Sequence, residues 1–155
     1  MLNHNERSES LDERIARVTL DLFEIDELSA LANEILQQGY DSVHLWRLAT
    51  SPHIAREEGS SLFHQGLHET SLPILSRAES ARLLAKAVAK NVLTGVTPPY
   101  DGAKYVWHVL YTQAPESAEL RVFVGLASEY EDDERRRSEY IQDIRDEFRR
   151  LLAGD

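Results

Sequence analysis

The sequence predicts an all-α fold, a single compact domain of about seven or eight helices arranged as an orthogonal bundle or as stacked helical hairpins. Capping boxes, which mark helix starts, begin at Ser10 and Ser76. Gly39 and Gly95 stand where helices should end, because glycine readily adopts the left-handed conformation that closes a helix. Apolar residues recur at three- and four-residue steps in several segments, which is the spacing of one helix face.

The first helices are expected close to the N-terminus. Residues 1–9 are polar and predict a mobile tail before a domain that spans 10–155. A helix is expected over 11–24, where apolar residues follow the first capping box at helical spacing. Asp26 is expected to cap a second helix that ends at Gly39. These two helices should form a tight hairpin.

The next part of the chain has weaker signals. A third helix is expected over 43–49, capped by Asp41 or Ser42, although its sequence VHLWRLA can also be interpreted as a strand. Glycines and serines interrupt the pattern over 52–73. Only one short helix, 62–69, is therefore expected there.

The signals are stronger from Ser76 onward. Its capping box should begin a helix that ends at Gly95. Thr97 as N-cap, with Pro98 in the first turn, is expected to begin the next helix, because proline fits the start of a helix well. Pro115 should break that helix.

Two further helices are expected before the C-terminus. Ser117 should cap a helix that runs to Tyr130, since the apolar spacing of this segment outweighs the strand propensity of its RVFVG sequence. The last helix is expected over 134–153. Gly102 and Gly125 lie inside predicted helices, where glycine costs about 1 kcal/mol relative to alanine. Each is therefore expected to allow close approach of another backbone.

Composition limits the classes of function. The chain has 155 residues, no cysteine, and 17 lysines and arginines against 27 acids, a net charge of −10. Thiolate chemistry and cysteine-based metal sites are excluded, and the charge repels nucleic acid. No apolar run approaches the length of a membrane span, so a cytoplasmic protein without a membrane partner is expected. A protein with a basic surface is the electrostatically favoured partner, although in most acidic proteins such a charge serves solubility alone.

Three segments carry a resemblance to known proteins. GYDSVHLWRLA (39–49), LLAKAVAKNVLTGVTPPYDGAKYVW (83–107) and LRVFVGLASEYEDD (120–133) resemble a group of small, acidic, all-helical bacterial proteins of uncharacterised function. The resemblance covers about two thirds of the chain and implies an all-helical fold, but no activity and no functional residue. Some such proteins are similar in size and charge to immunity proteins of bacterial toxin systems.

An acidic segment near the C-terminal helix is the candidate partner-binding site. It places five acids within six positions, and such a concentration of charge speeds association with a basic protein. Its members are Glu129, Glu131, Asp132, Asp133 and Glu134.

Two structural alternatives remain for these acids. Three of them precede an arginine of 135–137 by four residues, so they can also form ion pairs along one helix. A basic stripe of Arg82, Lys86 and Lys90 can bind an anion, but docking on the acidic segment within the protein is the preferred interpretation.

The candidates for small-molecule chemistry are weaker. Tyr100, Asp101, Trp107 and His108 can line a ligand pocket, although aromatic residues at helical spacing, here with Trp46, Tyr105 and Tyr111, belong to the core in most proteins. His64 and His68 are four residues apart on one predicted helix face, but two ligands do not make a metal site. We therefore predict surface histidines, no metal, no cofactor and no catalytic residue.

The resulting functional prediction is a non-enzymatic protein-interaction module that binds a partner through an acidic surface. An immunity or antitoxin-like protein that neutralises its partner is the specific form. The alternative is a small-molecule-binding protein or a metal-assisted enzyme with a pocket between helices.

Overall fold

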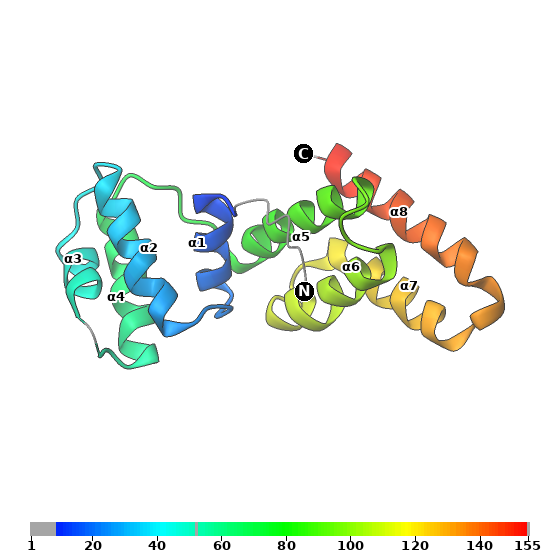
Figure 1. Cartoon of the computed structure of the whole chain (residues 1–155), viewed down its shortest axis with the longest axis horizontal. Helices are drawn as coiled ribbons and strands as arrows, with labels where there is room; N and C mark the ends of the chain where they lie inside the picture. Colours follow the sequence, from blue (N-terminus) through cyan, green and yellow to red (C-terminus); the bar gives the residue numbers. More distant parts are fainter. Residues whose placement is uncertain (1–8, 52, 155) are drawn as a thin grey trace. The chain divides into compact units, whose positions relative to one another are not determined.

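The structure is a computed structural model that describes residues 9–51 and 53–154. Within these ranges the chain forms eight α-helices and no strand, which confirms the predicted all-α fold (Figure 1). The strand interpretation of 43–49 is wrong, and the helical interpretation of RVFVG is confirmed. The predicted mobile tail, except for Glu9, lies outside the described residues.

Two compact units make up the chain, residues 1–75 and 76–155. This division does not decide whether both units unfold in one transition. The expectation of one domain over 10–155 therefore stays a prediction.

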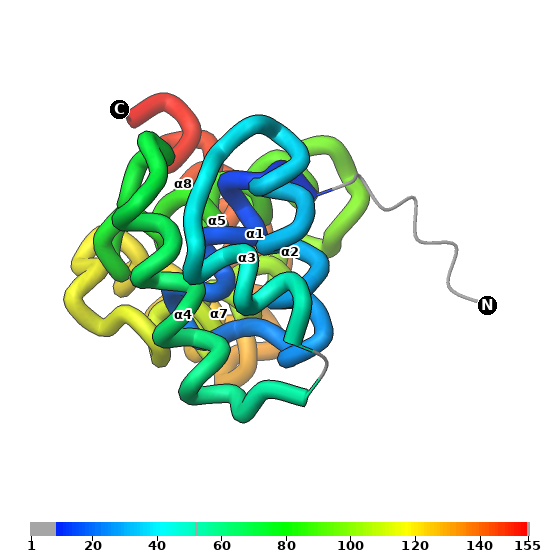
Figure 2. Tube along the Cα trace, turned by 90° about the vertical axis from the view of Figure 1, so that its left-hand side faces the viewer, coloured from blue at the N-terminus to red at the C-terminus, as the bar shows by residue number. Residues whose placement is uncertain are grey.

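The first unit contains α1 (Leu11–Thr19), α2 (Ile25–Gln37), α3 (Val43–Thr50) and α4 (Arg56–Glu69). Both views show α2, α3 and α4 packed side by side (Figures 1 and 2). The Ser10 and Ser42 side chains accept hydrogen bonds from the backbone N–H groups of Glu13 and Leu45, at 3.2 and 3.1 Å. Asp26 is not the cap of α2, because the helix begins at Ile25 and Glu24 is its N-cap.

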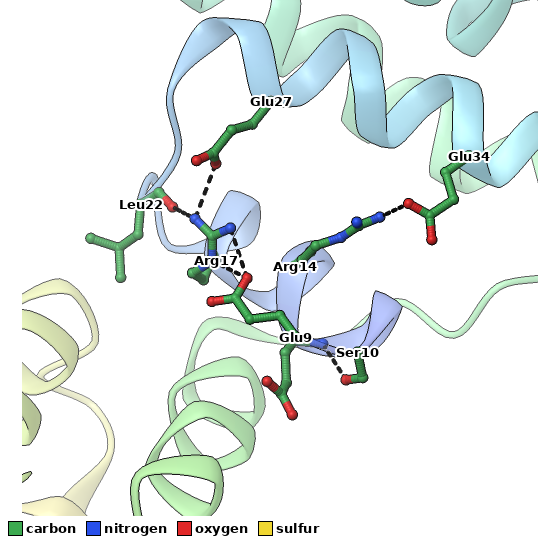
Figure 3. A network of polar contacts seen from close by, with 8 residues as sticks. Glu9, Ser10, Arg14, Arg17, Leu22, Glu27 and Glu34 are labelled. Atoms are coloured by element: carbon green, nitrogen blue, oxygen red, sulfur yellow. Dashed lines mark hydrogen bonds and ion pairs between the residues drawn. The ribbon is translucent and has the colours of Figure 1, made fainter. Parts of the chain in front are cut away.

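The predicted end of the first helix at residue 24 is wrong, because α1 ends at Thr19. Asp21 adopts a left-handed backbone conformation with φ 59°, which turns the chain. Arg17 donates to the Leu22 carbonyl at 2.9 Å and forms ion pairs with Glu9 and Glu27 (Figure 3). This network fixes the turn between α1 and α2. The apolar periodicity of the segment gives no sign of these polar contacts.

The helix predicted over 62–69 is longer in the structure, because α4 begins at Arg56. Two buried glycines in α4 fit beside other helices. A Cβ atom at Gly66 would lie 2.6 Å from Cγ of Leu45, and one at Gly59 would lie 3.0 Å from Cδ1 of Ile25. The glycines that weakened the helical pattern therefore allow close packing.

An apolar core holds the first unit together. Its members come from all four helices and from the segments between and after them. They are Ile15, Val18, Phe23, Leu28, Leu31, Ala32, Ile35, Leu45, Leu48, Leu62, Phe63, Leu67 and Leu72.

The second unit begins with α5 (Arg77–Leu93) and α6 (Pro99–Tyr105), and α6 continues into a π-helical segment, η1 (Val106–Tyr111). A short 3₁₀ turn, η2 (Ala118–Leu120), leads into α7 (Arg121–Asp132). A second one, η3 (Glu134–Arg136), leads into α8 (Arg137–Ala153).

Helix starts in the second unit agree only in part with the prediction. The capping box of Ser76 is formed in full. Pro98, rather than Thr97, is the N-cap of α6, with Pro99 as the first helical residue. Ser117 does not cap α7, because a 3₁₀ turn intervenes and its buried hydroxyl has no hydrogen-bond partner among the described residues.

Gly102 and Gly125, the two glycines predicted to allow close packing, have different surroundings in the structure. A Cβ atom at Gly102 would lie 2.6 Å from Cγ2 of Val92, so this glycine allows α5 and α6 to approach closely. Gly125 is exposed and has open space around its Cβ position. The packing role predicted for Gly125 is therefore wrong.

Candidate interaction surface

The acidic segment lies where α7 ends and α8 begins. Asp133 interrupts the helix, with φ −126° and ψ 88°, and its side chain accepts a hydrogen bond from the Arg135 backbone N–H at 3.2 Å. The predicted four-residue ion pairs are therefore wrong, since the acids and the arginines of 135–137 do not share one continuous helix.

The five acids divide into two groups. Glu131 accepts a hydrogen bond from the Tyr100 hydroxyl, and Asp133 caps η3. Glu129, Asp132 and Glu134 are exposed, and their carboxylates form no hydrogen bond or ion pair with any described residue. Three carboxylates of the predicted site are thus available to a partner.

The arginines beside the acidic segment have other contacts. Arg137 donates to the Tyr130 carbonyl at 3.0 Å and lies 4.9 Å above the Tyr130 ring. Arg136 forms an ion pair with Glu139 at 2.8 Å. These arginines stabilise the junction of α7 and α8 without pairing with the three available carboxylates.

Tyr100, the first of the predicted pocket residues, contacts Tyr130 and Glu131. The Tyr100 ring stacks on Tyr130 with centroids 4.3 Å apart. The hydrogen bond to the Glu131 carboxylate, together with partial burial and nearby negative charge, raises the pKa of Tyr100 to about 12. A phenol with such a pKa is poorly matched to proton transfer near neutral pH.

The other three pocket candidates lie on α6 and on η1. The Trp107 ring stacks on its chain neighbour His108, with centroids 4.2 Å apart. His108 and Asp101 are exposed, and Trp107 is half-buried. π-Helical segments are often found at functional sites. In η1, however, the Trp107 ring contacts His108, the next residue in the chain.

The histidine pair lies on α4, as its spacing suggested. The His64 ring lies 2.7 Å from the Ser60 carbonyl, one turn earlier in the same helix. Among the described residues, no group of three or more His, Cys, Asp or Glu side chains is arranged to hold a metal ion.

The basic stripe on α5 does dock within the protein, but not on the acidic segment. Arg82 and Lys86 both donate to the Gly154 carbonyl, at 2.5 and 3.1 Å, and Arg82 pairs with Glu119 at 3.0 Å. Cations at the C-terminus of α8 suit the helix dipole. The preferred interpretation, docking on residues 129–134, is therefore wrong for Arg82 and Lys86.

Negative charge is concentrated in the first unit. Residues 1–75 contain 13 acids and 5 arginines, a net charge of −8. Residues 76–155 contain 14 acids and 12 lysines and arginines, a net charge of −2. The electrostatic attraction for a basic partner is therefore strongest around the first unit.

The outer face of α3 exposes two large apolar side chains. Leu45 and Leu48 are fully buried on its inner face, whereas Val43 is 77% exposed and Trp46 is 58% exposed. These two are three residues apart, so they lie on one side of the helix. Trp46 is therefore not a core residue.

An open groove lies beside Trp46. It has a volume of about 380 Å³ and is formed by the end of α2, the following loop and α3. Leu36, Tyr40 and Ala49 line it and also pack against the core of the first unit. Asp41, at the same groove, forms no ion pair within the described part of the chain.

Sequence reasoning missed this surface, although a signal was present. The segment VHLWRLA has apolar residues on both faces of a short helix, Leu45 and Leu48 on one and Val43 and Trp46 on the other. A surface helix normally has one apolar stripe. The second stripe was the available indication of an exposed apolar face.

Comparisons with known proteins find no matching family model, no matching curated relative and no matching solved structure. Within residues 9–51 and 53–154, none of the helices combines the length and apolar character that a membrane span requires.

Proposed function

We propose that this chain is a protein-interaction module that binds a partner with a basic surface. The observation that carries the proposal is the exposure of Val43 and Trp46, side by side, on the strongly acidic first unit. Large aromatic side chains with an apolar body and a polar N–H group are common in protein interfaces.

Charge and apolar surface have separate roles in this proposal. A net charge of −10 accelerates encounter with a cationic protein and disfavours acidic ones. Burial of Trp46 and Val43 then supplies affinity, because a few central apolar residues carry most of the binding energy in an interface. The carboxylates of Glu129, Asp132 and Glu134 add to the attraction.

The neutralisation of a toxic partner is a specific form of this function. An acidic protein that covers a basic surface of its partner blocks that surface by charge complementarity and by steric exclusion. The resemblance to immunity-type proteins is the reason to propose it.

A small-molecule-binding protein or a metal-assisted enzyme has less support. The Tyr100 hydroxyl is engaged by Glu131, and the pKa of about 12 removes it from acid–base chemistry near neutrality. The described groove has one carboxylate in its wall, Asp41, and no second carboxylate and no histidine beside it.

Affinity capture tests the proposed function. The wild-type chain, immobilised and exposed to extract of the cells that make it, should retain one basic protein at low salt and release it at high salt. Retention of no protein, or of only acidic proteins, would contradict the proposed function.

Removing the three available carboxylates should slow association with that captured protein. We expect the combined substitutions Glu129→Gln, Asp132→Asn and Glu134→Gln to reduce the association rate several-fold at low salt and much less at high salt. Stability should not change, because these side chains form no hydrogen bond or ion pair with described residues. Stopped-flow fluorescence at two salt concentrations measures the rates.

A matched control separates this segment from net charge in general. Asp101→Asn, Glu116→Gln and Asp143→Asn remove the same number of exposed charges from other parts of the second unit. Equal slowing by both triple variants would show that only net charge matters, and residues 129–134 would then no longer be proposed as a binding site.

A further inference from the structure

The groove beside Trp46 has the features of a docking site for one apolar side chain. Its floor is fixed, since Leu36, Tyr40 and Ala49 pack against the buried core. Its volume of about 380 Å³ is near the lower end of the range for ligand pockets. A rigid groove of this size accepts a large side chain with little rearrangement.

Trp46 and Val43 extend the apolar surface beyond the groove. Single exposed apolar residues are ordinary on protein surfaces. Here two lie on one side of α3, and one of them also forms the groove wall. Two exposed apolar side chains next to an open groove form a candidate interaction site.

Charge around the groove selects a basic occupant. The nearby cation on α3, Arg47, is already paired with Glu58 at 3.3 Å, and the His44 ring contacts the Glu69 carboxylate. Asp41 is exposed and has no ion pair among the described residues. The groove therefore combines partly apolar walls with an available carboxylate, on a unit with a net charge of −8.

The backbone around the groove selects a helical occupant. Peptides that bind in extended form usually add a strand to an exposed sheet edge. The described residues of this chain form no strand, so no such edge exists in this part of the molecule. Contacts between side chains must then supply the affinity of the groove for its partner. An amphipathic helix suits this, because it presents its apolar side chains along one face.

We propose that the groove formed by α2 and α3 binds a basic amphipathic helix of the partner protein. One large apolar side chain of that helix enters the groove and contacts Trp46, while a neighbouring lysine or arginine pairs with Asp41. This assignment rests on the proposed function and adds the surface and the chemistry of the segment that it recognises.

The probe for the test is a fluorescently labelled synthetic peptide of leucine and lysine, about 18 residues long so that it can form a helix. Leucines occupy one helical face. One control peptide has the same composition in an order that does not segregate leucine from lysine. A second control replaces every lysine by glutamate. Fluorescence anisotropy with the full chain gives the dissociation constants.

Binding of the amphipathic basic peptide, but of neither control, is expected for the wild-type chain. Trp46→Ala should weaken binding about 10-fold or more, as loss of a central aromatic anchor does. Val43→Ser and Asp41→Asn should each weaken it by a smaller factor. Val96→Ser is the matched control, because Val96 is 61% exposed but lies outside the groove, and it should bind as the wild type does.

Several results would overturn the docking site. Equal affinity of the Trp46→Ala and Val96→Ser variants would show that the peptide binds elsewhere, and the capture experiment would then decide the proposed function. Failure of the peptide to bind at all would overturn the groove assignment, while the capture experiment decides the proposed function independently. A wild-type dimer in light scattering that the Trp46→Ala variant lacks would identify a second copy as the occupant. Circular dichroism of each variant verifies folding.

Discussion

Replacing Phe63 by alanine will lower the free energy of unfolding by about 3–5 kcal/mol. Phe63 is fully buried among residues of all four helices of the first unit, so the substitution leaves a cavity that its neighbours cannot fill completely. Denaturant unfolding followed by circular dichroism measures the loss. Because such a loss is comparable to the whole stability of many domains, Phe63→Leu provides a milder variant, which should be destabilised to a smaller degree.

Phe148→Ala is the matched change in the second unit, where Phe148 is fully buried and stacks on Phe123 with centroids 4.4 Å apart. If the chain is one domain, as predicted, both substitutions shift one common transition. Two transitions, each shifted by only one of the substitutions, would contradict the prediction of a single domain. A negligible effect of Phe63→Ala and Phe63→Leu would contradict the packing of the first unit.

Alanine at Gly102 and alanine at Gly125 should have opposite effects. At Gly102 the new Cβ would lie 2.6 Å from Cγ2 of Val92, a buried β-branched side chain with little freedom to move. Overpacking costs about 1–3 kcal/mol and the better helix propensity of alanine returns about 1 kcal/mol, so we expect a net loss of up to about 2 kcal/mol. At Gly125 the Cβ position is open, and only the gain of about 1 kcal/mol remains.

The urea midpoints of unfolding of the two glycine variants and the wild type test this prediction, provided that the slope of the unfolding free energy against urea concentration is unchanged. Stabilisation of the chain by Gly102→Ala would contradict the close approach of α5 and α6. Destabilisation by Gly125→Ala would indicate a packing role for Gly125 that the structure does not show.

Helix starts with strong local chemistry were predictable from the sequence. The Ser76 capping box depends only on residues three positions apart, Ser76 and Glu79, and both of its hydrogen bonds are present. Gly39 and Gly95 end helices with φ of 97° and 80°, the left-handed conformation that glycine readily adopts. Such features need no knowledge of the tertiary structure.

Tertiary contacts decided the elements that the sequence did not reveal. The turn after Thr19 is held by Arg17 and by Arg56, which donates to the Asp21 and Phe23 carbonyls from the start of α4. The first turns of α4, which the prediction missed, contain Gly59, and this glycine fits against Ile25 of α2. Neither contact has a signature within its own helix.

The candidate site was predictable only in part. The acidic segment was evident from the sequence. The hydrogen bonds of Glu131 with Tyr100 and of Asp133 with the 3₁₀ turn were not, because they depend on the tertiary structure. The concentration of charge in residues 1–75 becomes visible only when the unit boundary is known. The exposure of Trp46 depends on which side of α3 faces the core.

Site-specific crosslinking tests the central claim most directly. A photoreactive phenylalanine analogue at position 43, next to the groove, should form a covalent adduct with the partner retained in affinity capture, and the peptide found in that adduct should be rich in lysine, arginine and apolar residues. The same analogue at position 96 is the control and should give little adduct. Equal crosslinking at both positions, or adduct formation at position 96 alone, would contradict binding at the face of α3.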